Sequence, residues 1–119
     1  EREARWVQET FAHIGLDEEI NCQPNRWQHL VGYVDHMAVA TATLFFTGAT
    51  VGLYFISTAL QWRRRGLGAA ITAAALEVAR ARDAQWAVLC ASAMGYSTYR
   101  RVGFSDLANI GIYTWRPPL

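Results

Sequence analysis

Apolar residues recur every three or four positions in two long stretches of the chain, which is the period of an amphipathic helix. Residues 2–14 form the first stretch, and residues 66–82 form the second. Asp17 is a suitable N-cap for a short helix after the first stretch. A further short helix is predicted over residues 95–102, because Gly103 is a natural C-cap.

Other stretches alternate with a period of two and are rich in β-branched and aromatic residues, a pattern typical of strands. Three consecutive strands are predicted over residues 28–34, 38–47 and 50–58, the last two joined by a tight hairpin. A buried strand over Trp86–Ala91 and a last strand over Ile110–Trp115 complete the predicted sheet. The predicted order is α-(α)-βββ-α-β-α-β.

The chain has no charged residue from His36 to Trp62, and such a run is long enough to span a membrane as a helix. Repeated threonines lower its hydropathy, however, and Gly48 and Gly52 bracket a turn-like sequence in its middle. Uncharged strands are expected in a sheet that is covered on both faces. We therefore interpret the run as two strands and predict neither a membrane span nor a membrane partner.

Composition indicates one globular domain over residues 1–119, with 52% hydrophobic and 18% charged residues and no repeat or linker. The net charge of +1 is unevenly distributed, at −4 for residues 1–35 and +5 for the remainder. Positive charge is concentrated around Arg63–Arg65 and Arg100–Arg101. Local patches on a near-neutral protein favour an anionic ligand over nucleic acid, which would need a broader basic face.

The cysteines and histidines show no pattern typical of a disulfide framework or a metal site. Cys22 and Cys90 are far apart, and His13, His29 and His36 lack metal-ligand spacing. We expect Cys90 to be buried in its strand. No signal peptide is recognisable, and the expected location is the cytoplasm.

The most informative segment runs from Thr58 to Ala70, where a strand, three arginines and a Gly-x-Gly sequence precede a helix. A helix N-terminus offers unpaired N–H groups and a partial positive charge to phosphate oxygens. Glycines let the backbone approach the ligand, and the arginines add charge-assisted contacts. The segment lacks the Lys-Ser/Thr of a Walker A loop and the third glycine of the Rossmann fingerprint. A pyrophosphate group is the natural ligand of such a turn.

Arg63-Arg-Arg-Gly-Leu-Gly-Ala69 resembles the Q/R-x-x-G-x-G/A motif of the GNAT (N-acetyltransferase) superfamily. The stretch from Leu89 to Phe104 is similar to that family's second motif, which ends in Tyr-x-x-x-Gly-Phe. The resemblance covers roughly residues 28–116. It implies an α/β (α+β) fold with a mixed, mostly antiparallel sheet and helices on both faces. The family's first strand has no counterpart here, and the chain resembles the C-terminal domain of longer bacterial proteins.

The resemblance also implies a cofactor, acetyl-CoA as acyl donor, and no metal. Its pantetheine would lie between two splayed parallel strands, those ending at Thr58 and at Ala91. The residues implied to bind CoA are Ile56, Ser57, Thr58, Arg63, Arg64, Arg65, Gly66, Leu67, Gly68, Ala69 and Ser92. Ser92 stands where many relatives carry Asn, and Leu60 where they usually have Pro. Trp62 is a further residue that could contact CoA.

Tyr99 matches the family's tyrosine, which protonates the departing thiolate. The general base remains open, because residues 52–58 contain no carboxylate. The candidates are a water held by backbone carbonyls, Tyr54, Glu18 or Glu19, and His29.

Two functions remain open from the sequence. The first is an enzyme, a GNAT-type N-acetyltransferase that moves an acetyl group from acetyl-CoA to a small-molecule or peptide amine. The second is a non-catalytic module that binds acyl-CoA or builds an oligomer interface. A homodimer is compatible with either function.

Overall fold

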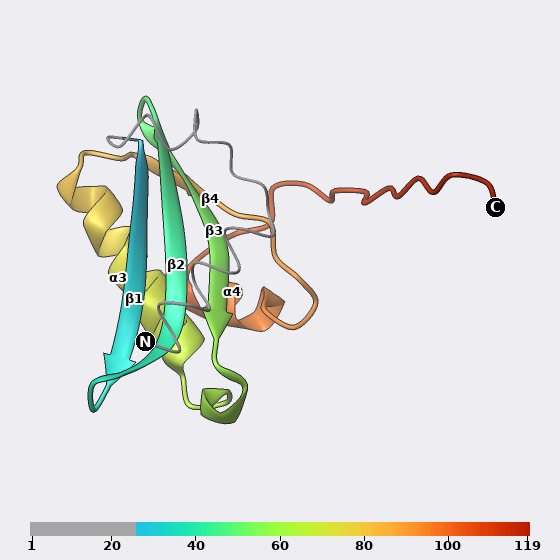
Figure 1. The fold of residues 1–119 in the computed structure, drawn as a ribbon. Coiled ribbons are helices and arrows are strands. Elements are labelled where there is room, and N and C mark those ends of the chain that lie inside the picture. Colours follow the sequence, from blue (N-terminus) through green and yellow to red (C-terminus); the bar gives the residue numbers. More distant parts are fainter. Residues whose placement is uncertain (1–25) are drawn as a thin grey trace.

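Three antiparallel strands form the centre of the computed structural model, which describes residues 26–119. β1 (Trp27–Val34) pairs with β2 (Met37–Thr47), and β2 pairs with β3 (Thr50–Thr58) (Figure 1). Asp35 and His36 form the first turn, both with positive φ, as a tight two-residue hairpin requires. The three predicted strands and their two turns are confirmed. The helices predicted over residues 2–14 and after Asp17 lie outside the described residues.

The fourth strand, β4 (Trp86–Val88), runs parallel to β3 at the edge of the sheet, in the order β1-β2-β3-β4. The sheet is therefore mixed and mostly antiparallel, as predicted. The buried strand expected over Trp86–Ala91 is wrong in its length and burial, because β4 ends at Val88 and Trp86 is 70% exposed. Cys90 is also exposed rather than buried. Among the described residues β4 pairs only with β3, and its side chains Trp86 and Val88 are exposed while Ala87 packs against the core.

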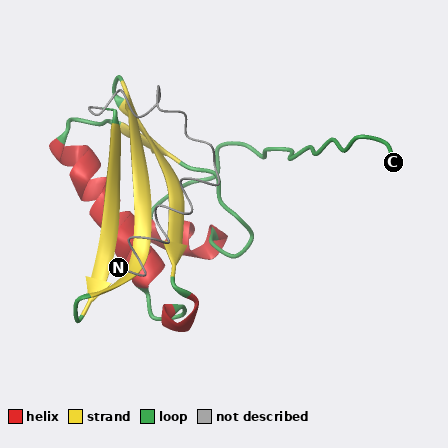
Figure 2. Ribbon diagram, viewed as in Figure 1, coloured by secondary structure: helices red, strands yellow, loops and turns green. Residues whose placement is uncertain are grey.

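One long helix, α3 (Leu67–Ala81), packs against one face of the sheet (Figure 2). Its buried side chains Ile71, Ala75 and Ala79 join a core formed by β2 and β3. Small alanines on both sides let the helix approach the strands closely, and Leu44 at the centre of β2 is fully buried. The predicted helix over residues 66–82 is confirmed within one residue at each end. Helices are predicted on both faces of the sheet. Among the described residues, α3 is the helix that covers this face.

Two short helices flank the start of α3. A 3-10 turn, η1 (Leu60–Trp62), follows β3 directly, and α4 (Tyr96–Val102) packs against α3. Gly103 ends α4 with a φ of 121°, which confirms the predicted helix and its glycine cap.

Residues 104–119 contain no helix or strand, so the strand predicted over Ile110–Trp115 is wrong. Figure 1 shows this segment leaving the body of the protein as an extended arm. Beyond Phe104, which packs against the core, its large apolar side chains are exposed, with Ile112 at 93% and Tyr113 at 94%. A strand forms only where another edge accepts its hydrogen bonds, and β4 offers an edge of only three residues.

The uncharged run from Met37 to Leu60 forms β2, β3 and the start of η1, as the strand interpretation predicted. Within residues 26–119, no helix has the length and apolar character needed to cross a membrane.

Candidate active site

The chain turns sharply between β3 and α3, and this turn exposes the first backbone N–H groups of the helix. Gly66 is the N-cap of α3 with a φ of 78°, and Arg64 also has a positive φ, of 63°. Ala70 donates the first helical hydrogen bond, to Gly66 O at 3.0 Å. The N–H groups of Leu67, Gly68 and Ala69 precede this bond and point out of the N-terminal end of the helix.

A cavity of about 510 Å³ opens at this end of α3 and extends to the end of β3 and to α4. It brings together all the predicted site residues except Arg65. Those that line it are Ile56, Ser57, Thr58, Arg63, Arg64, Gly66, Leu67, Gly68, Ala69, Ser92 and Tyr99. Residues that are 43 positions apart in the sequence thus share one hollow, because α4 packs against the start of α3.

The charged side chains that line the cavity are all arginines: Arg63, Arg64 and Arg101, with no carboxylate among the described lining residues. Arg63 is tied back to the strand, since its Nε donates to Thr58 O at 3.2 Å. Arg65 does not line the cavity itself and stacks over the ring of Trp62, a lining residue, with 4.7 Å from its Cζ to the ring centroid. The cavity is therefore electropositive and suited to an anionic ligand.

The end of β3 is separated from β4, and it is locally bulged. The parallel pairing joins only Thr50–Gly52 to Trp86–Val88, so Ile56–Thr58 extend beyond it and line the cavity. Between two paired positions β3 has one residue more than β2, and Phe55 adopts a φ of 53° there. The hydroxyl of Thr41 donates to Phe55 O at 3.1 Å and fixes the bulge. A bulge turns backbone groups out of the ladder and redirects the strand.

Tyr99 reaches the cavity from α4 in a half-buried position. Its ring lies close to the backbone of Gly95, where an added Cβ would stand 2.8 Å from Tyr99 Cε2. Phe104 packs edge-on against it, with 6.2 Å between the ring centroids. Burial raises the pKa of Tyr99, so its phenol is a neutral O–H donor at physiological pH.

The candidate bases lie elsewhere on the sheet or outside the described residues. His29 Nδ1 is 3.0 Å from Thr43 Oγ1, and burial lowers the pKa of His29, which favours the neutral imidazole. Tyr54 is 46% exposed and packs beside Trp27. Neither His29 nor Tyr54 lines the cavity. Glu18 and Glu19 fall among residues that the structure does not describe.

The sequence model of the acetyltransferase (GNAT) family matches residues 2–104. The chain belongs to this family. No curated protein sequence matches this one significantly.

Solved structures show the same GNAT fold at low sequence identity. The aminoglycoside N-acetyltransferase AAC(6')-Iy in complex with CoA has a TM-score of 0.72 and 16% identity, covering 97% of this chain and 92% of that one. A predicted acetyltransferase with acetyl-CoA from Clostridium acetobutylicum has a TM-score of 0.68 and 17% identity, covering 90% and 84%. Glucosamine-6-phosphate N-acetyltransferase from Arabidopsis thaliana has a TM-score of 0.67 and 15% identity, covering 82% and 72%.

The structure also adds residues to this GNAT site that the sequence motifs did not assign. These residues are Met94, Gly95, Thr98 and Arg101, and Trp62, already named from the sequence as a further residue that could contact CoA, also lines the cavity. Thr98 and Arg101 are three positions apart on α4, so they lie on the same face of the helix, and this face lines the cavity. The concentration of positive charge at Arg100 and Arg101 was the sequence signal for this wall, but it could not tell which arginine faces the ligand.

Proposed function

We propose that this GNAT protein is an N-acetyltransferase that moves the acetyl group of acetyl-CoA to an amine by direct attack in a ternary complex. The observation that supports this best is the arginine-lined cavity at the N-terminus of α3. Its described lining has no carboxylate, and it adjoins both the end of β3 and the phenol of Tyr99.

The pyrophosphate of the donor fits the N-terminal end of α3. We propose that the N–H groups of Gly66–Ala69 bind it, because they are turned outward and carry the positive end of the helix dipole. Arg63 and Arg64 add charge from the turn, and Arg101 adds it from α4. Arg65 is next to this group and contributes positive charge while its guanidinium stacks on Trp62.

The pantetheine arm and the thioester fit the end of β3. Because β4 stops at Val88, Ile56–Thr58 form an open strand edge that can pair with the amides of the arm like an added strand. Ser92 also lines the cavity. A backbone N–H in residues 56–58 would polarise the thioester carbonyl and stabilise its developing negative charge.

Tyr99 is proposed as the general acid. The amine nitrogen forms a bond to the acetyl carbon, and the carbon–sulfur bond breaks. The electron pair leaves with sulfur, which takes the proton of the Tyr99 hydroxyl and departs as the thiol. The proton that the amine loses passes to a base, and water held by backbone carbonyls, His29, Tyr54 and Glu18 or Glu19 remain the candidates.

The acceptor is proposed to be a small-molecule or peptide amine. Two structural neighbours carry an aminoglycoside or glucosamine-6-phosphate in their names, and both of these molecules contain amino groups. Residues 1–35 carry a net charge of −4, which favours a cationic amine. We further propose one domain over residues 1–119 that lacks the family's first strand, a cytoplasmic location where acetyl-CoA is available, and a homodimer.

The test combines binding and turnover. Calorimetry should detect acetyl-CoA binding to the purified protein, and a free-thiol assay over a panel of amines should detect CoA release. Tyr99→Phe should lower kcat about 100-fold or more while leaving acetyl-CoA binding intact. Tyr113→Phe, which removes a hydroxyl from the exposed arm, is the matched control and should be neutral.

Two results would contradict the proposal. Absence of acetyl-CoA binding would remove the cofactor site, and unchanged kcat in Tyr99→Phe would remove the assigned acid. Binding without thiol release for any amine would instead favour the non-catalytic acyl-CoA-binding module, which the lack of a carboxylate in the described cavity lining also fits.

A further inference from the structure

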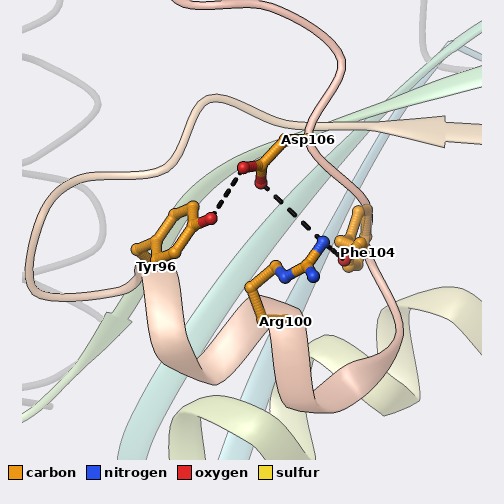
Figure 3. Close-up of polar contacts among 4 residues, drawn as sticks. All are labelled: Tyr96, Arg100, Phe104 and Asp106. Carbon is orange, nitrogen blue, oxygen red and sulfur yellow. Dashed lines mark hydrogen bonds and ion pairs between the residues drawn. The ribbon is translucent and has the colours of Figure 1, made fainter.

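Three side chains are joined in a cluster at the outer side of α4 (Figure 3). The hydroxyl of Tyr96 donates to Asp106 Oδ2 at 2.7 Å, and Arg100 Nη1 lies 4.0 Å from Asp106 Oδ1. Arg100 Nη1 also donates to Phe104 O at 3.4 Å. The cluster connects two residues of α4 to the segment that follows the helix.

The cluster and the cavity lie on different sides of α4. Thr98, Tyr99 and Arg101 line the cavity, whereas Tyr96 and Arg100 do not. Tyr96 and Arg100 are four positions apart, so they share one helix face. Asp106 bridges them from the segment after Gly103, as Figure 3 shows.

The length of α4 explains why such a contact matters. A helix of seven residues is far below the length that is stable alone in water, so tertiary contacts must hold it. On its inner side α4 packs against α3. At its end Tyr99 O accepts hydrogen bonds from Gly103 N at 3.2 Å and Phe104 N at 3.0 Å. The segment after the helix is thus tied to the backbone of Tyr99 itself.

We propose that Asp106 is a positioning residue: by holding Tyr96 and Arg100 it keeps α4 folded and places Tyr99 at the cavity. This rests on the proposed function, in which Tyr99 is the acid. None of the three residues lines the cavity, so they do not touch the donor. Their effect reaches the reaction through the last turn of α4.

The expected effect falls on turnover more than on donor binding or global stability. Asp106 and Arg100 are exposed, and exposed pairs add little to the stability of a whole domain. Most of the proposed pyrophosphate cradle belongs to α3 and its preceding turn, and α4 adds only the charge of Arg101 to it. Loosening α4 should therefore lower the fraction of molecules with Tyr99 in place and change the affinity for acetyl-CoA only slightly.

Two variants break the cluster without altering the cavity lining. Tyr96→Phe removes one hydroxyl and no charge, and Tyr113→Phe on the exposed arm is its matched control. Asp106→Ala removes both contacts of the carboxylate, and Asp106→Glu tests rescue. We expect Tyr96→Phe and Asp106→Ala to lower kcat about three- to tenfold, with KM for acetyl-CoA changed less than twofold. Asp106→Glu should recover part of kcat, and Tyr113→Phe should match the wild type.

Amide hydrogen exchange provides a second measurement that does not depend on activity. The amides of Gly103 and Phe104 should exchange several-fold faster in Asp106→Ala, while amides in the centre of α3 keep their rates. Unchanged exchange at these two amides would overturn the proposal. A parallel rise in KM and fall in melting temperature would equally overturn it, because both would indicate a general structural role.

Different results would contradict the acid role of Tyr99 and the positioning role of Asp106. If Tyr99→Phe leaves kcat intact, the acid assignment fails, and exchange at Gly103 and Phe104 still decides whether Asp106 holds α4. If Tyr99→Phe abolishes turnover but Asp106→Ala changes neither kcat nor exchange, only the positioning role of Asp106 fails.

Discussion

Two neighbouring arginines differ in their relation to the cavity, and this difference predicts different effects on coenzyme affinity. Arg64 lines the cavity, whereas Arg65 does not and instead stacks over the lining residue Trp62. Both carry one charge on the same exposed turn. Arg64→Gln should therefore weaken CoA binding more than Arg65→Gln, although both variants change the net charge equally.

The magnitude follows from the exposure of the turn. Opposite unit charges about 4 Å apart attract by about 1 kcal/mol in water and by about 4 kcal/mol at the effective dielectric near a protein surface. Arg64 is exposed, so a value near the lower limit, about 1–2 kcal/mol, is appropriate. This corresponds to a Kd about 5- to 30-fold higher for Arg64→Gln. For Arg65→Gln, which loses only longer-range attraction, we expect less than about threefold.

Calorimetric titration of CoA at about 0.05 M and 0.15 M salt measures both effects. Screening should shrink the Arg65→Gln effect at the higher salt more than the Arg64→Gln effect, because close contacts are screened less. Equal losses for the two variants at both salt concentrations would refute the reasoning. They would show that affinity depends on net charge and not on which guanidinium faces the cavity.

The remaining predictions concern the core, the bulge and a histidine on β1. Leu44→Ala, at a fully buried position, should lower the free energy of unfolding by about 2–5 kcal/mol in urea denaturation. Thr41→Val removes the hydroxyl that donates to Phe55 O and should cost about 1 kcal/mol and also reduce kcat, since the bulge leads into residues 56–58. Burial lowers the pKa of His29, so the unfolded state binds its proton more readily. Stability should thus fall as the pH drops below about 6.5, and His29→Gln should flatten that dependence in thermal melts.

The regular part of the fold was predictable because each element repeats its own period. Alanines alternate with β-branched residues from Ala38 to Thr43 in β2, and the apolar stripe of α3 fixes the face that packs on the sheet. The arm was not predictable in this way, because Ile110–Trp115 has strand composition but no partner edge among the described residues. Strand propensity is a property of a single segment, whereas a strand forms only when that segment pairs with a second one.

The candidate site likewise has one part that the sequence predicts and another part that only the structure reveals. The Arg63–Ala69 turn was visible in the sequence because a helix N-terminus with glycines has a local signature. Arg101 and Thr98 were not, since they reach the cavity only through the packing of α4 on α3. Nor could three consecutive arginines reveal that Arg65 stacks on Trp62 while Arg64 faces the cavity.

The early end of β4 accounts for the errors in the predicted fourth strand, and together with the bulge in β3 it leaves the edge of Ile56–Thr58 open. In the observed register, a strand that continued from Val88 to Ala91 would run beside β3 as far as Phe55, where the free edge of Ile56–Thr58 begins. Because pairing stops at Gly52 and Val88, that edge stays open and bends away at the Phe55 bulge. The space gained is the cavity that α3 and α4 then line with arginines and Tyr99. Irregularity in the sheet is therefore a requirement of the proposed coenzyme cleft.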